Sequence, residues 1–397
     1  MKHFLLVFLI SGCIPALAQP WLHRDNSPEL DSLSFFFFGD VMQHEPQISG
    51  AWNAETADYD YLPCFQYITP YWQKADYVIA NLETTLSDRG YSGYPQFCAP
   101  WQLARDLKAC GVDILTTNNN HSCDKGHRGI AKTIYYLDSL QFPHTGTFTD
   151  TTAWITRSPL YIRQGKFKIA LISYTYGTNG IPVTHGQVVS MIDTFHMARQ
   201  IEKALLDTVT NIIAVMHWGE EYFTAPNATQ KKLSSWLHER GADIVIGSHP
   251  HVIQPISYIQ HEQDTLGVTV FSLGNFVSNQ SKRYTNGGLG VHLTLYRQNG
   301  KTRYRMQTLS NYVYRPQEDG KDVIMSSPNR KPTESSPART LCSIPDFSGY
   351  RFDYRSYSTE IPIRIGAHRK STPQIFLPGL ILCNKICNFV ELKNNNF

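Results

Sequence analysis

Polar side chains that can bind a metal ion or transfer a proton follow a series of apolar segments in this sequence. In an open α/β sheet, ligands bind just beyond the carboxyl ends of the strands, so residues that directly follow strands are candidates for a shared site. If these strand ends share one edge, two carboxylates, an asparagine and several histidines converge there. These candidates are Asp40, Glu83, Asn120, His217, His249 and His251, and His121 directly follows the asparagine, with Asp124 three residues later.

Mixed sets of carboxylate, amide and imidazole side chains suit divalent ions such as Mn²⁺, Zn²⁺ or Fe²⁺. Two such ions about 3.5–4 Å apart would hold a phosphoester and activate a water molecule. The sequence therefore predicts one or two divalent ions as the cofactor. His249 and His251 are the most specific pair, because residues i and i+2 of an extended segment face the same side.

His121 is the candidate acid or base of the site. An imidazole can take up or release a proton near neutral pH, and Asp124, three residues later, is placed to orient it. The alternative is that His121 only shapes the loop of asparagines that precedes it.

Each candidate also has a purely structural alternative. Asp40 fits a helix N-cap or a turn, and Glu83 fits a carboxylate on the surface. The run Asn118–Asn120 fits an ordinary loop, because asparagine tolerates turns. His217 fits a histidine packed in the core. The metal-site interpretation depends on the joint occurrence of these residues in order, not on any one of them.

The apolar segments are predicted strands that alternate with predicted helices. This alternation predicts an α/β fold with largely parallel, buried strands. The run 289–315 instead predicts an antiparallel hairpin that turns at Asn299-Gly300. The expected strands are 33–39, 76–82, 112–117, 168–174, 211–216, 243–247 and 268–273, and the expected helices are 101–110, 125–141, 193–207 and 229–240.

The composition is that of an ordinary globular protein, with 42% hydrophobic and 17% charged residues. The net charge of +3 comes from the end of the chain: residues 321–397 hold 11 Lys and Arg against 6 Asp and Glu, which leaves 25 against 27 in residues 1–320. Binding to nucleic-acid phosphates needs a concentrated basic face. A mildly acidic body therefore argues against nucleic acid as a partner.

The N-terminus predicts export. Lys2 and His3 precede an apolar run, and Ala16-Leu17-Ala18 supplies a cleavage site, so residues 1–18 are interpreted as a signal peptide. The alternative is a lipid attached to Cys13, because residues 10–13 resemble a lipobox. In both cases we expect an exported protein, either periplasmic or associated with the cell envelope. The body is expected to be one domain over residues 33–320, followed by a basic, poorly patterned tail over 321–397.

Six short segments of the chain share the order and spacing of one known protein family. They are Gly39-Asp40-Val41-Met42, Asn81-Leu82-Glu83, Asn119-Asn120-His121 with Asp124, His217-Trp218-Gly219 with Glu221, Gly247-Ser248-His249-Pro250-His251 and Ser272-Leu273-Gly274-Asn275-Phe276. The set resembles the CapA family of bacterial capsule and poly-γ-glutamate synthesis proteins, also called PgsA, over about residues 33–281. The resemblance implies the fold of the related calcineurin-like metallophosphoesterases, a four-layer α/β sandwich in which helices flank two sheets.

The resemblance also implies a role for each candidate. Asp40 matches the first metal carboxylate of the phosphoesterase pattern, and Glu83 takes the place of the bridging aspartate. His121 matches the acid that protonates a leaving group. One ion would bind Asp40, Glu83 and His251, and the other would bind Glu83, Asn120, His217 and His249.

Two positions depart from the phosphoesterase pattern. That pattern has a histidine two residues after its first aspartate, where this sequence has Met42, and its bridging aspartate is replaced by Glu83. A thioether is a poor ligand for a hard ion, so the first site lacks one ligand unless His44 or Glu45 supplies it. These differences predict a site adapted to another substrate, or one that holds a single ion.

The resemblance implies an exported protein that acts in the synthesis or export of a capsule or of poly-γ-glutamate. Its partners would be an anionic extracellular polymer or its precursor, and membrane-bound polymer synthase subunits. Two alternatives remain: a metal-dependent, phosphoesterase-like hydrolase of the cell envelope, and a non-catalytic scaffold subunit of a polymer synthesis complex. The departure at Met42 favours the scaffold, whereas the intact His121, Asn120 and His249/His251 pair favour the hydrolase.

Overall fold

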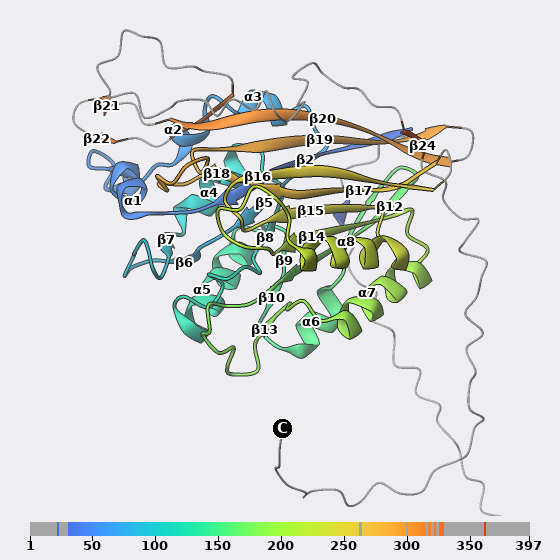
Figure 1. Ribbon diagram of the computed structural model, residues 1–397. Coiled ribbons are helices and arrows are strands. Elements are labelled where there is room, and N and C mark those ends of the chain that lie inside the picture. The colour runs from blue at the N-terminus through green and yellow to red at the C-terminus, as the bar shows by residue number, and fades with distance from the viewer. Residues whose placement is uncertain are drawn as a thin grey trace, which may run out of the picture. The chain divides into compact units, whose positions relative to one another are not determined.

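Two large β-sheets dominate the computed structural model of the chain (Figure 1). Among the described residues, the first sheet has seven strands in the order β1 (Leu22–His23), β11 (Leu160–Gln164), β12 (Phe167–Thr175), β14 (Asn211–His217), β15 (Ile244–Ser248), β17 (Asp264–Leu273) and β16 (Ile253–His261). The path of the second sheet is β23 (Met325–Pro328), β20 (Lys301–Tyr314), β19 (Gly287–Gln298), β2 (Ser32–Val41), β5 (Tyr77–Leu82), β8 (Ile114–Thr116) and β9 (His144–Thr145).

Two short strands complete the second sheet, which has nine strands in the part of the chain that is described. They are β18 (Asn275–Val277), which pairs with β2, and β24 (Ile361–Pro362), which pairs with β20. Two-stranded ribbons join β3 (Trp52–Asn53) to β4 (Asp58–Tyr59), β6 (Thr85–Ser87) to β7 (Cys98–Pro100), β10 (Thr147–Phe148) to β13 (Val188–Val189) and β21 (Gln317–Glu318) to β22 (Lys321–Asp322).

The structure describes residues 22–23, 31–261, 264–298, 301–314, 317–318, 321–322, 325–328 and 361–362. All of them fall within one compact unit of the chain, residues 1–364. The predicted signal peptide 1–18, Cys13 and most of the predicted tail 321–397 lie outside the described residues, and the division at residue 321 stays a prediction. Both β23 and β24, which come after that point, pair with β20.

All seven segments predicted as strands are strands, and all four segments predicted as helices are helices. The helices are α4 (Gln102–Ala109), α5 (Gly126–Ser139), α7 (Thr194–Leu206) and α8 (Ala228–Arg240), accompanied by the shorter α1 (Glu45–Ala51), α2 (Leu62–Phe65), α3 (Thr69–Trp72) and α6 (Thr151–Arg157). None of the described helices combines the length and the hydropathy that crossing a bilayer requires.

The pairing of the strands is largely parallel in the middle of each sheet. Strands β12, β14, β15 and β17 run parallel to one another in the first sheet, and β2, β5, β8 and β9 do so in the second. The predicted hairpin is confirmed: β19 and β20 are antiparallel, and Gln298 pairs with Lys301. Because parallel neighbours end at the same edge of their sheet, the polar strand ends of each sheet lie together.

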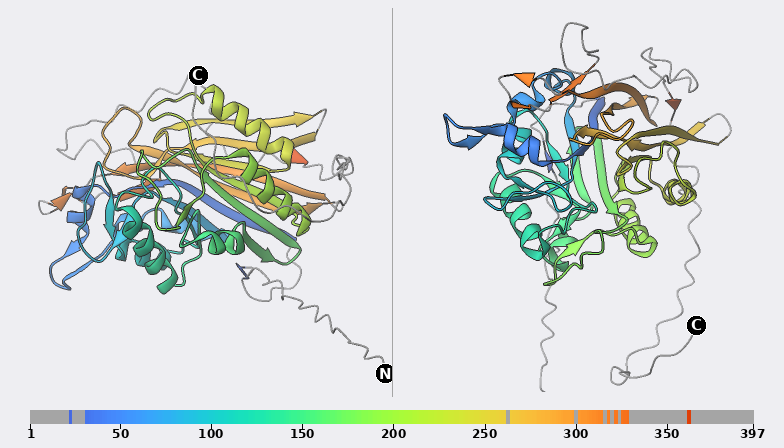
Figure 2. Two further views of the ribbon diagram at one scale, coloured as in Figure 1. Left: turned by 90° about the horizontal axis from the view of Figure 1, so that it is seen from below. Right: turned by 60° about the vertical axis from the view of Figure 1, so that its left-hand side comes forward.

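The two sheets and the helices outside them form four layers (Figure 2). In β2, Phe36 and Phe38 face a cluster that includes α3 and α4, and the ring of Phe38 stacks on Trp72 with centroids 4.9 Å apart. In β14, Ile212 and Ala214 face residues of α7 and α8. The alternate residues of each strand point the other way.

Those alternate residues form the contact between the two sheets. A small cavity there is lined by Phe37 and Ile79 from one sheet and by Val215 and Ile246 from the other. Helices therefore cover the outer face of each sheet, and the two sheets face each other. This is the four-layer α/β arrangement that the sequence led us to expect.

Local sequence sets the start and the end of α8, the helix between the two histidine-bearing strand ends. The side chain of Asn227 accepts from the backbone N–H of Gln230 at 2.9 Å, and the Gln230 side chain accepts from the N–H of Asn227 at 3.0 Å. This reciprocal capping box satisfies donors that a helix otherwise leaves unpaired. The helix ends at Gly241, whose φ of +109° a glycine adopts without strain.

The described cysteines are buried thiols. Cys64, Cys98, Cys110 and Cys123 are all free, and the other four of the eight cysteines lie outside the described residues. Burial raises the pKa of the Cys64 thiol to about 12. These four side chains behave as small apolar residues of the core.

A β-bulge at Gly39 determines the direction of the first candidate carboxylate. The register with β5 pairs Phe38 with Ala80 and then Asp40 with Asn81, so Gly39 is the extra residue. Because Phe38 faces the helices, simple alternation would turn Asp40 the same way. The extra residue turns Asp40 instead toward the space between the sheets.

We expect Gly39→Ala to destabilise the protein and to displace Asp40. A Cβ atom at this position would lie 1.8 Å from the carbonyl oxygen of Gly274, which also accepts the N–H of Asp40 at 3.1 Å. Relieving such overpacking typically costs about 1–3 kcal/mol. The measurement is the free energy of unfolding in urea, compared with Gly177→Ala, where an added Cβ meets no atom within 4 Å. Equal stability of the two variants would contradict the role assigned to the bulge.

Candidate metal centre

The six predicted metal ligands lie together at the carboxyl ends of the strands. Asp40 is the next-to-last residue of strand β2, Glu83 directly follows β5, and His217 is the last residue of β14. Asn120 follows β8, and His249 and His251 lie on the segment between β15 and β16. Every one of these side chains is at least 97% buried, so the two sheets enclose the cluster completely.

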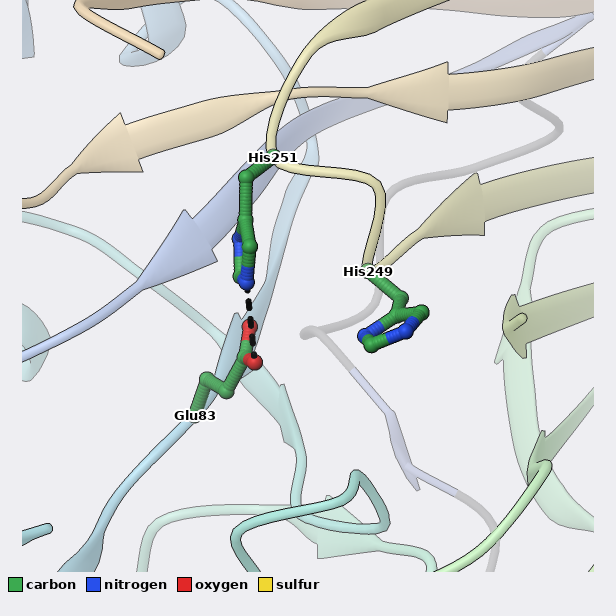
Figure 3. Close-up of side chains that lie close together, drawn as sticks. All are labelled: Glu83, His249 and His251. Atoms are coloured by element: carbon green, nitrogen blue, oxygen red, sulfur yellow. Dashed lines mark ion pairs between the residues drawn. The ribbon is translucent and has the colours of Figure 1, made fainter. Parts of the chain in front are cut away.

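Glu83 is the centre of the cluster. Its Oε1 lies 3.7 Å from Nε2 of His217 and 3.8 Å from Nε2 of His251. Figure 3 shows the Glu83 carboxylate directed at the ring of His251, with His249 extending beside them from the same segment as His251. Two groups able to hold a metal ion share this carboxylate: Glu83 with His249 and His251, and Glu83 with Asp40 and His217, each with its ligand atoms within 4.8 Å of one another.

Asp40 ionises readily although it is buried. Burial alone would raise the pKa of its carboxyl, but hydrogen bonding and charge from His251, together with a hydrogen bond from Asn81, hold that pKa below its usual value. Nδ2 of Asn81 donates to Oδ1 of Asp40 at 2.8 Å, and Oδ2 of Asp40 lies 3.2 Å from Nδ1 of His251. Asp40 is therefore a carboxylate at neutral pH.

Glu83 has the opposite electrostatic environment. Burial raises the pKa of its carboxyl well above the usual value, and the negative charge of Asp40 raises it further. Two buried carboxylates side by side cannot both carry charge without a compensating cation. This pair therefore has the electrostatics of a cation site.

Unpartnered buried atoms support the fit to a divalent ion. Within the described residues, Oε1 of Glu83 and Nδ1 of His249 are both buried and make no hydrogen bond. An unpaired buried polar group costs about 1–3 kcal/mol. Carboxylate oxygen and imidazole nitrogen are the donor atoms that Zn²⁺ and Mn²⁺ accept, so the residues present fit such an ion.

Two histidines of the cluster, His217 and His249, are held in the neutral form that binds metals. Burial lowers the pKa of His217 well below its usual value, and the neighbouring His249, His251 and His121 lower it further. Burial, with a smaller contribution from His251, lowers the pKa of His249 to about 3. An imidazole that stays neutral keeps a lone pair available to a metal ion.

The backbone of the histidine pair differs from the extended segment expected from the sequence. His249 has a φ of +98° and His251 a φ of +58°, on either side of Pro250. Left-handed backbone at residues other than glycine costs about 1–3 kcal/mol each. The two rings do meet at one site, with centroids 5.9 Å apart. A strained turn, and not the alternation of side chains along a strand, brings them together.

Amide side chains that the sequence did not single out hold the ligands in place. Asn81 donates to Asp40 and lies 3.3 Å from Nδ1 of His217, while Asn119 donates to Oδ1 of Asn81 at 3.2 Å. Asn275 places its Oδ1 3.1 Å from Nδ1 of His251. The sequence did contain a signal for Asn81. It stands two residues before Glu83, and residues i and i+2 of an extended segment face the same side.

Asn120 and Ser248 fix the ring of His217 from both sides. Oδ1 of Asn120 lies 2.8 Å from Nε2 of His217, and Oγ of Ser248 lies 3.0 Å from its Nδ1. The ring plane of His217 is thus set by its polar neighbours. Such contacts orient a metal-binding histidine and select its tautomer.

His121 and Asp124 form a pair beside the cluster. Nδ1 of His121 lies 2.7 Å from Oδ2 of Asp124, which also accepts the backbone N–H of Phe97 at 2.5 Å. The ring of Phe97 meets the His121 ring edge-on with centroids 4.6 Å apart. Asp124 therefore orients the imidazole, as the spacing of the two residues suggested.

His44 and Glu45 do not fill the position left by Met42. Nδ1 of His44 lies 3.2 Å from Oε1 of Gln47 and accepts the backbone N–H of Asn279 at 3.3 Å. Glu45 is exposed in the first turn of α1. Among the described residues, neither belongs to a group able to hold a metal ion.

Comparisons with known proteins identify relatives over most of the chain. A family model described as "Bacterial capsule synthesis protein PGA_cap" matches residues 34–280. The capsule biosynthesis protein CapA of Bacillus anthracis is 28% identical over 297 residues, which are 71% of this chain and 67% of that protein. The PGA biosynthesis protein CapA of Bacillus subtilis is 27% identical over 323 residues, which are 77% of this chain and 80% of that protein.

Solved structures show more distant likenesses. The NAD nucleotidase NadN of Haemophilus influenzae has a TM-score of 0.35 and 12% identity, covering 76% of this chain and 55% of that one. A 5'-nucleotidase from Candida albicans has a TM-score of 0.38 and 14% identity, covering 68% and 49%. The chain spans about half the length of these two proteins, and likenesses at this level support no inference about activity.

We expect Asn81→Ala to weaken divalent metal binding about 10–100-fold, the usual effect of removing a residue that orients metal ligands. The change removes the donor that Asp40 receives at 2.8 Å. The matched control is Asn118→Ala, which removes an equally buried amide that contacts Ser173 and Ser190 and none of the six ligands. Titration of both variants with Mn²⁺ or Zn²⁺ measures the difference, and equal affinities would contradict a supporting role for Asn81.

Proposed function

Because the chain belongs to the bacterial capsule synthesis protein PGA_cap family, we propose that it acts in the synthesis or export of an anionic extracellular polymer. The polymer is poly-γ-glutamate or a capsular polysaccharide, and the protein is exported to the periplasm or cell envelope. The names of the two curated relatives, capsule biosynthesis and PGA biosynthesis proteins, support this assignment. The single observation that carries a site for it is the buried pair Asp40 and Glu83 among buried histidines.

We propose that this cluster binds a divalent ion through Asp40, Glu83, Asn120, His217, His249 and His251. A bound ion would polarise a carbonyl or phosphoryl oxygen and lower the pKa of a coordinated water molecule. The protein's own residues set the conditions for that chemistry. The two sheets exclude bulk water from the ligands, and Asn81 and Asn275 hold the carboxylate and imidazole groups in position.

The first test is the metal content of the purified protein. We expect bound Mn²⁺ or Zn²⁺ in the wild type and its loss in a His249→Ala, His251→Ala double variant. The control is His144→Ala, a buried histidine whose Nδ1 lies 2.9 Å from the carbonyl oxygen of Phe142, outside the cluster. Metal retained by the double variant would place the ion elsewhere.

The second test is the polymer itself. Cells that lack this gene should lose extracellular polymer, and the wild-type gene should restore it. We expect an Asp40→Ala, His217→Ala variant to be produced and exported without restoring the polymer, because it lacks two of the six ligands. Full restoration by that variant would contradict a functional metal site and would favour a scaffold role for the protein.

A hydrolase of phosphodiester or amide bonds is the second candidate, and the geometry of His121 favours it. The imidazole is oriented by Asp124 and lies beside the cluster, where it could protonate a leaving group. In this reading, water adds to the phosphorus or carbonyl carbon of the substrate, and His121 delivers a proton to the departing oxygen or nitrogen.

We expect His121→Ala to lower turnover of a phosphodiester or γ-glutamyl substrate by about 10²–10⁴-fold, the usual contribution of a general acid, while metal content stays unchanged. Steady-state kinetics on metal-loaded protein measures the effect. A variant that keeps both its metal and its full rate would exclude His121 as the acid.

A further inference from the structure

A lysine is held above an aromatic ring next to the metal cluster. Nζ of Lys282 lies 3.6 Å from the centre of the Tyr222 ring, a cation–π contact. The Tyr222 ring in turn has its centre 6.1 Å from that of His251. The ammonium nitrogen therefore lies no further from the centre of the His251 ring than the sum of these two distances.

Both members of this pair are tied to the segment that carries His249 and His251. Tyr222 has a left-handed backbone, with a φ of +70°, and its N–H donates to the carbonyl oxygen of Pro250 at 2.8 Å. The backbone of Tyr222 is thus held against Pro250, which positions the ring that Lys282 contacts.

Hydrogen bonds also connect the backbone of Lys282 to the cluster. The carbonyl oxygen of Lys282 accepts from the N–H and the hydroxyl of Thr285, at 3.1 and 2.7 Å. The carbonyl oxygen of Thr285 accepts from Nδ2 of Asn275 at 2.9 Å, and Asn275 contacts His251. A chain of hydrogen bonds therefore links the backbone of Lys282 to a candidate metal ligand.

The charge of Lys282 is available to a ligand. The side chain is exposed, and within the described residues its contact is the face of Tyr222 and not a carboxylate. An ammonium group has three N–H donors, and a contact with a ring face leaves donors free for an oxyanion. The interior of the site holds Asp40 and Glu83, so an anionic substrate that approaches the cluster needs a positive group nearby.

We infer that Lys282, positioned by Tyr222, binds a carboxylate or phosphate of the substrate beside the metal cluster and selects anionic over neutral polymers. This inference rests on the proposed function, because it takes the cluster as the place where the substrate reacts. Lys282 contributes binding and selection, whereas the metal ligands and His121 contribute the chemistry. The polymer is then held with one anionic group on Lys282 and its reacting group directed toward the cluster.

The test measures binding of three soluble polymers to the metal-loaded full chain: poly-γ-glutamate, a glycerol phosphate polymer and uncharged dextran. We expect the wild type to bind at least one anionic polymer more tightly than dextran, in a salt-dependent manner. Lys282→Glu should weaken that binding on the order of tenfold, and Lys282→Arg should keep most of it. Binding of poly-γ-glutamate would identify a carboxylate as the group that Lys282 binds, and binding of the glycerol phosphate polymer would identify a phosphate.

The controls separate this inference from the proposed function. Lys168→Glu reverses a charge at the amino end of β12, the end remote from the cluster, and should leave binding unchanged. Metal content should be the same in all these variants, because Lys282 is not a ligand. Full binding by Lys282→Glu, or no preference of the wild type for anionic polymers, would overturn the inference even if metal is bound. Absence of metal in the wild type would instead overturn the proposed site, and a lysine-dependent preference for anions would still support Lys282.

Discussion

Two carboxylates, Asp40 and Glu83, are completely buried side by side where the two sheets meet, and the rest of the site is organised around that burial. A buried charge is costly unless it is paired or bound to a metal ion. Here His251 and the amide of Asn81 compensate Asp40, whereas burial keeps His217 neutral and raises the pKa of Glu83. These contacts leave Glu83 uncompensated, so the pair retains a preference for a cation.

Several irregular features of the fold serve this arrangement. The bulge at Gly39 turns Asp40 into the space between the sheets, and the left-handed residues His249 and His251 turn two rings toward it. Each feature departs from regular strand or loop geometry at some energetic cost. All three residues lie at the strand ends where the ligands meet. The parallel strands thus supply the frame, and local irregularities at their ends direct the ligands.

The sequence was sufficient for the frame and for the side chains that meet at the strand ends, but not for the contacts that hold those side chains in place. Alternating apolar segments predicted the strands and helices, and parallel pairing then implied that the residues after the strands meet at one edge. The contact between His251 and Asp40 joins positions 211 apart in the chain, across two sheets, and no local pattern encodes its geometry. For the same reason the contacts of Asn275 and Tyr222 could not be predicted, since their partners become neighbours only when the sheets pack. The turn at Pro250 was expected to be extended, and its left-handed backbone follows from tertiary contacts that override local preference.

The most direct measurement of the central claim is the position of the ion itself. Crystals of the full chain grown with Mn²⁺ and measured at an X-ray wavelength where manganese scatters anomalously would show each bound ion as a peak. The account predicts a peak bonded to Glu83 and to at least one of His217, His249 and His251. Saturating Mn²⁺ with no peak between these residues would contradict it.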